Sequence, residues 1–113
     1  MKVDLNEKYE YIPEWNGNRE DPSPIVFHCK YLTTGERQKC IVEKFVQAEL
    51  VVEQDDVAIM RYAVDYIENL EDEDSGQKIS KGDQIVGVRK LASLVREVAN
   101  DAVLRNMRPD LKN

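Results

Sequence analysis

The sequence predicts a mainly α-helical fold, a small helical bundle with a short N-terminal β element and an extended arm. Apolar residues recur at spacings of three and four in successive segments after residue 33, and only one segment alternates clearly as a strand. A chain of 113 residues can bury one continuous core but is too short for two stable domains. We therefore expect one domain over residues 1–113, with an arm or loop at 1–24, a strand at 25–32 and a helical bundle at 33–113.

The arm and the strand are predicted from turn signals and from alternation. Residues 1–24 show no sustained periodicity and contain the turn dipeptide Asn16-Gly17. Residues 9–12 alternate aromatic and polar side chains before Pro13, so they can be extended. Residues 25–32 are rich in β-branched and aromatic side chains and form the best strand. A lone strand is not stable, so its partner is either the segment at residues 9–12 or an edge on another chain.

Two helices are expected in the middle of the chain. Thr33 and Glu36 have the spacing of a capping box, which starts the first helix. Its apolar face consists of Ile41, Phe45, Ala48 and Val52. Asp55 or Asp56 can cap a second helix that ends near Asn69. No Gly or Pro separates the two helices, so a single long bent helix is an open alternative.

The last helix has the clearest amphipathic pattern. A polar connection at residues 71–82 precedes it, and Ser80 with Asp83 reads as its cap. The helix is expected to finish before Pro109. Its buried face is formed by positions spaced three and four apart: Ile85, Val88, Leu91, Val95, Val98 and Ala102.

Charge and composition exclude several classes of function. Sixteen basic and twenty-two acidic residues give 16 − 22 = −6, a field that repels phosphate backbones, so nucleic acid is not an expected partner. No stretch approaches the ~20 apolar residues that span a bilayer, and the polar N-terminus does not resemble a signal peptide. Cys29 and Cys40 are expected to be reduced thiols. The expected location is the cytoplasm, with no membrane partner.

The sequence offers no catalytic, cofactor or metal site. One His and five Gly cannot supply a phosphate loop, a nucleophile elbow or a catalytic triad. His28 with the two cysteines falls short of the four ligands that zinc usually needs. Residues 72–83 partly match a calcium-binding EF-hand loop, but Gln77 stands where the motif requires Gly. The sequence therefore predicts a protein that is not an enzyme, and leaves open whether residues 72–83 bind an ion.

Aromatic and apolar side chains near the N-terminus are the candidate partner contacts. Trp and Tyr dominate binding hot spots, so a flexible arm that carries them suits an interface, although they could equally fold back over the core. The strand could pair with an exposed edge of a partner by β-addition. The predicted contacts are Tyr9, Tyr11 and Trp15 on the arm and Ile25, Phe27 and Tyr31 on the strand.

The chain resembles the short tail assembly chaperones of long-tailed bacteriophages and prophages. The resemblance covers most of residues 32–113 and depends on the order of elements and on short phrases. These phrases are Tyr11-Ile12-Pro13-Glu14, Leu32-Thr33-Thr34-Gly35-Glu36-Arg37, Val64-Asp65-Tyr66-Ile67-Glu68-Asn69-Leu70, Lys78-Ile79, Ser80-Lys81-Gly82-Asp83 and the terminal Leu111-Lys112-Asn113.

This resemblance implies a non-enzymatic role in virion morphogenesis in the cytoplasm of a bacterial host. Such chaperones bind unpolymerised tail tube subunits and bring them to the tape measure protein. The alternative is a generic helical protein-protein adaptor or regulator of a phage or bacterium. The oligomeric state stays open, a homo-oligomer included, as does a longer frameshifted form.

Overall fold

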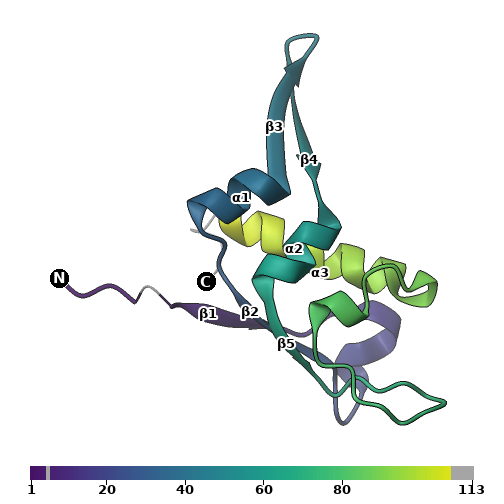
Figure 1. Cartoon of the computed structure of the whole chain (residues 1–113). Coiled ribbons are helices and arrows are strands. Elements are labelled where there is room, and N and C mark those ends of the chain that lie inside the picture. The colour runs from purple at the N-terminus through teal and green to yellow at the C-terminus, as the bar shows by residue number, and fades with distance from the viewer. Residues whose placement is uncertain (5, 108–113) are drawn as a thin grey trace.

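The computed structural model describes residues 1–4 and 6–107 and has a mixed α/β fold (Figure 1). Within these residues five strands form two antiparallel sheets beside three α-helices and three 3-10 turns. The expectation of a mainly α-helical bundle is therefore wrong. Two segments that were expected to be helical form strands instead, and the chain from 1 to 24 is more regular than an arm or loop.

A three-stranded antiparallel sheet supports the body of the protein. Its strands are β1 (Lys8–Tyr11), β2 (Val26–Lys30) and β5 (Val64–Glu68), in the order β1-β2-β5. The predicted strand thus pairs with the segment at residues 9–12, one of the two partners considered. Tyr9 lies opposite Cys29 and Tyr11 opposite Phe27, so these four side chains share one face.

The first helix begins where the capping box predicts but ends early. In α1 (Thr34–Cys40) the hydroxyl of Thr33 accepts a hydrogen bond from the Glu36 amide at 3.2 Å, and the Glu36 carboxylate accepts one from the Thr33 amide at 3.0 Å. The chain then enters β3 (Ile41–Val46) and β4 (Glu49–Gln54), which form a hairpin. Five β-branched residues in this stretch favour strand: Ile41, Val42, Val46, Val51 and Val52.

The second helix is likewise shorter than predicted. Asp55 caps α2 (Asp56–Ala63) by accepting a hydrogen bond from the Ala58 amide at 3.1 Å. The expected continuation to Asn69 is wrong because the next residues pair with β2 as β5, where Phe27 lies opposite Ile67. The single long helix is excluded by the hairpin that separates α1 from α2.

Irregular chain with two 3-10 turns precedes the last helix. These turns are η2 (Gly82–Gln84) and η3 (Arg89–Leu91), and they replace the first part of the helix expected after Asp83. At Gly82 a Cβ atom would lie 2.6 Å from the carbonyl oxygen of Met60, so only glycine allows this close approach to α2. Helix α3 spans Ala92–Met107, and the end predicted before Pro109 lies outside the described residues.

The core lies between the inner face of the three-stranded sheet and helices α2 and α3. Phe27 at the centre of β2 is 0% exposed, and it belongs to the same buried cluster as Met60 and Leu94. A second cluster joins α1, α2, α3 and the base of the hairpin: Cys40, Ile41, Ile59, Ala63, Ala99, Ala102 and Val103.

The two phenylalanines of the chain should differ sharply in their effect on stability. Phe27→Ala removes a fully buried ring and leaves a cavity, so it should lower the free energy of unfolding by about 3–5 kcal/mol. Phe45→Ala removes a ring that is 76% exposed and should change it by less than about 0.5 kcal/mol. Urea unfolding followed by circular dichroism measures both, and equal losses would contradict the described core.

The capping box should give a pH-dependent contribution to stability. The Thr33 amide that donates to Glu36 lowers the pKa of this carboxyl below its ordinary 4.5. A lowered pKa stabilises the fold above pH 4.5, and the contribution disappears as the pH falls through the folded-state pKa. Glu36→Gln keeps a hydrogen-bond acceptor but loses the charge. It should therefore lower the free energy of unfolding by about 0.5–1 kcal/mol at pH 7 and leave it almost unchanged in strong acid. A difference that is independent of pH would refute this assignment.

Candidate protein-binding surface

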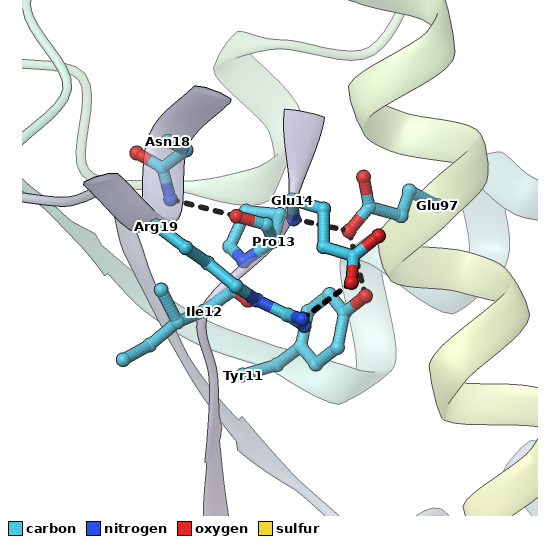
Figure 2. Close-up of polar contacts among 7 residues, drawn as sticks. All are labelled: Tyr11, Ile12, Pro13, Glu14, Asn18, Arg19 and Glu97. Carbon is cyan, nitrogen blue, oxygen red and sulfur yellow. Dashed lines mark hydrogen bonds and ion pairs between the residues drawn. The ribbon is translucent and has the colours of Figure 1, made fainter. Parts of the chain in front are cut away.

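The aromatic residues predicted as partner contacts on the arm are held against α3. Figure 2 shows Tyr11 and Glu14 converging on Glu97: the tyrosine hydroxyl donates to this carboxylate at 2.6 Å and the Glu14 amide donates at 2.8 Å. Trp15 donates from its indole nitrogen to the Ser93 hydroxyl at 3.0 Å. Burial, and then the hydrogen bond to Glu97, raise the pKa of Tyr11. This part of the chain is therefore a docked segment and not an extended arm.

Asn18 fixes the turn that brings this segment back to β2. Its side chain is 7% exposed and donates to the carbonyl oxygens of Pro13 and Ile25, each at 3.0 Å (Figure 2 shows the first). It also accepts from the Ile25 amide at 2.7 Å. Three backbone groups near the core are satisfied by this one amide, which keeps residues 13–25 in a closed loop.

The predicted contacts on the strand are also used inside the fold. Ile25 and Phe27 are buried in the core, so a partner could reach them only if the sheet opened. The ring centroids of Tyr31 and Tyr9 lie 5.0 Å apart, and the guanidinium of Arg105 lies 4.2 Å from the Tyr9 ring centroid. All six predicted contact residues therefore make contacts within the chain itself, and their assignment to a partner stays a prediction.

The two cysteines lie in buried positions. Cys29 lies on the inner face of β2, where burial raises the pKa of its thiol to about 12. Burial also raises the pKa of Cys40 at the end of α1. A thiol with a raised pKa is a poor nucleophile near neutral pH. In the described part of the chain no three His, Cys, Asp or Glu side chains gather closely enough to hold a metal ion, and this includes residues 72–83.

The feature that stands out is the hairpin β3–β4, which projects from the body between α1 and α2 (Figure 1). Its base is fixed: Ile41 is buried, and the Asp55 amide donates to the Cys40 carbonyl at 2.8 Å. The Gln54 side chain adds a hydrogen bond to Asn100 of α3 at 2.8 Å. Between residues 42 and 53 only Val51 is partly buried, and every other residue is exposed.

One face of the hairpin is mostly apolar. The register pairs Phe45 with Leu50 and Glu43 with Val52, and residues that lie directly opposite share a face. Phe45 is 76% exposed, Leu50 56% and Val52 40%. The opposite face carries Val42 and Val46, which are also exposed. Single exposed apolar residues are common in soluble proteins, but several that share one face are typical of an interaction surface.

The hairpin also offers unpaired backbone. Its sheet has the order β3-β4, so within the described chain each strand has one edge without a neighbour. Such edges can accept a further strand by β-addition. Four charged side chains limit non-specific pairing: Glu43, Lys44, Glu49 and Glu53. Lys44 forms an ion pair with Glu53 across the strands at 2.7 Å.

The composition of residues 41–54 indicated strands, but the helix-like spacing of their apolar residues led to a helix prediction. Apolar residues at 41, 45, 48 and 52 fit one helical face, and that face has to be buried to be stable. In the hairpin Ile41, Phe45 and Val52 also share a face, but only Ile41 reaches the core. The enrichment in β-branched residues was the signal that could have identified the strands.

The turn of the hairpin is expected to limit its stability. Gln47 and Ala48 both have positive φ values, 52° and 66°, as in a type I′ turn, which strongly favours Asn-Gly. Left-handed backbone costs a residue with a Cβ atom about 1 kcal/mol. In the double change Gln47→Asn and Ala48→Gly only the glycine removes a Cβ atom, so amide hydrogen exchange in β3 and β4 should slow by about fivefold. Exchange in β2 and α3 is the internal control, and faster exchange in the hairpin would contradict the observed turn.

No protein-family model matches this chain, and no match was found among curated proteins or solved structures. In the described part of the chain, no helix combines the length and apolar composition needed to cross a membrane.

Proposed function

We propose that this protein is a non-enzymatic tail assembly chaperone of a phage or prophage, and that it binds tail tube subunits through the hairpin β3–β4. The observation that carries the proposal is the exposure of Phe45, Leu50 and Val52 on a strand pair that projects from a well-packed body. A two-stranded hairpin is only marginally stable on its own, and a third strand adds hydrogen bonds along one of its two free edges.

The hairpin provides two kinds of contact that a chaperone of assembly subunits needs. A free strand edge can pair with the exposed edge of an unassembled subunit and block its polymerisation. The apolar face of Phe45 and Leu50 can cover apolar surface on the same subunit. Contact through the hairpin replaces the earlier assignment to β2, whose edges are already occupied by β1 and β5.

The identity of the partner comes from the family resemblance. The resemblance depends partly on an expected order of elements, and the structure differs from that order because the hairpin and β5 interrupt the expected helices. The quoted phrases themselves are unaffected, and one of them, residues 32–37, forms the capped start of α1 that leads into the hairpin. The net charge of −6 would help to keep a complex soluble. The tape measure protein is the second partner that the resemblance implies.

The proposal is tested by co-expression with the tail tube protein encoded in the same genome, scored by size-exclusion chromatography with light scattering. The native chain should give a soluble complex of defined stoichiometry. Phe45→Lys should weaken binding by about thirtyfold or more, as expected for the loss of a central hot spot. Leu104→Lys is the control because Leu104 is likewise an exposed apolar residue, 56% exposed, but lies on α3.

Two results would count against the proposal. Unchanged binding by Phe45→Lys, with a folded variant confirmed by circular dichroism, would exclude the hairpin as the contact surface. Independent elution of the two native proteins, with tube assembly unaffected, would favour the adaptor or regulator function instead.

A further inference from the structure

A second surface lies on the body of the protein, away from the hairpin residues. The turn η1 (Trp15–Glu20), the loop after β5 and the turn η3 line a groove with a volume of about 720 Å³. Its lining combines apolar side chains with acidic ones, and no hairpin residue takes part. The proposed chaperone function does not use this groove.

The apolar part of the groove is continuous with the core. Trp15, Leu70, Ile79 and Leu91 line it and pack at the same time against the buried cluster around Phe27. Their outward parts are therefore held in place by the fold. Val88, which is 40% exposed, adds a further apolar contact in the groove. A fixed apolar floor favours binding because little side-chain entropy is lost when it is covered.

One wall of the groove is an ordered acidic loop. The Asp72 amide donates to the Gln77 carbonyl at 2.8 Å, and the Gly76 amide donates to the Asp72 carbonyl at 2.8 Å, which closes the loop on itself. The Ser75 hydroxyl donates to the Asp72 carboxylate at 2.7 Å. The backbone of this wall is thus fixed by its own hydrogen bonds.

The charges on the wall are not balanced within the described chain. Four carboxylates line the groove, those of Glu71, Asp72, Glu73 and Asp74, against one basic side chain, that of Lys90, so the lining has a net charge of −4 + 1 = −3. Among residues 1–4 and 6–107, no Lys or Arg forms an ion pair with Glu71, Glu73 or Asp74. An acidic wall beside an apolar floor complements a segment that carries both basic and bulky apolar side chains.

We propose that this groove binds a short basic segment of another protein. The apolar side chains of that segment contact Trp15, Val88 and Leu91, and its basic side chains lie against Glu73 and Asp74. Alternation of the two kinds of side chain along an extended segment matches a floor and a wall that lie side by side. The protein would then hold two partners at once, one at the hairpin and one at the groove.

Trp15 makes the proposal directly measurable, because it is the only tryptophan in the chain and lines the groove. The probe is a short synthetic peptide in which arginine and leucine alternate, titrated into the full chain at low salt. The tryptophan emission should shift and saturate, and the affinity should fall as salt is added. A peptide with glutamate in place of every arginine is the control and should not bind.

A pair of charge variants tests the acidic wall. Glu73→Gln with Asp74→Asn should weaken binding of the arginine peptide by about fivefold. Glu49→Gln with Glu53→Gln removes the same charge from the hairpin and should change affinity by less than about twofold. Thermal unfolding confirms that both double variants are folded.

The proposal would be overturned by any of three results. Equal weakening in both double variants would mean that net charge alone attracts the peptide. An unchanged Trp15 emission during saturable binding would place the peptide elsewhere. Concentration-dependent dimerisation that shifts the Trp15 emission without peptide would identify a second copy of the chain as the occupant. None of these results bears on binding at the hairpin, so the two proposals can fail separately.

Discussion

Burial of the inner face of β2 against α3 is the constraint on which the remaining structure depends. Phe27 is completely buried, and its ring requires flanking strands on both sides and a helix above it. The flanking strands come from distant parts of the chain, β1 near the N-terminus and β5 after α2. Because Tyr11 lies opposite Phe27, its side chain faces α3 and reaches Glu97. The same constraint that builds the core therefore holds Tyr11 against the body of the protein.

The hairpin is positioned by two helix caps. The capping box at Thr33 starts α1, and the Asp55 cap starts α2, so the intervening chain leaves and re-enters the body at fixed points. The hydrogen bond from Asp55 to Cys40 joins these points. Toward the tip, residues 44–46 and 49–51 pair with each other, and all of them except Val51 are exposed. A rigid base with an unsupported tip allows the tip to adapt to a partner at low cost to the core.

The hairpin and the groove differ in the chemistry that they offer. The hairpin provides strand edges and exposed rings such as Phe45, which suit another sheet. The groove provides a fixed apolar floor and an acidic wall, which suit a basic segment. The exposed hairpin residues and the acidic wall of the groove lie outside the two buried clusters, so changes in either one are compatible with an intact fold. Such separation allows a small domain to connect two partners.

Local chemistry by itself determined the strand at β2, the cap at Thr33, a second cap at Asp55 or Asp56 and the glycine-containing loop before the last helix. These features depend on neighbours within a few residues, which the sequence displays directly. Tertiary structure decided the element type of two segments that the sequence pattern wrongly predicted as helical. These are the hairpin at Ile41–Gln54 and the strand β5. Val64 and Ile67 fit a helical face as well as a strand, and only the unpaired edge of β2 selects the strand. The candidate surfaces were missed for the same reason, because exposure is a property of the assembled fold and not of the order of residues.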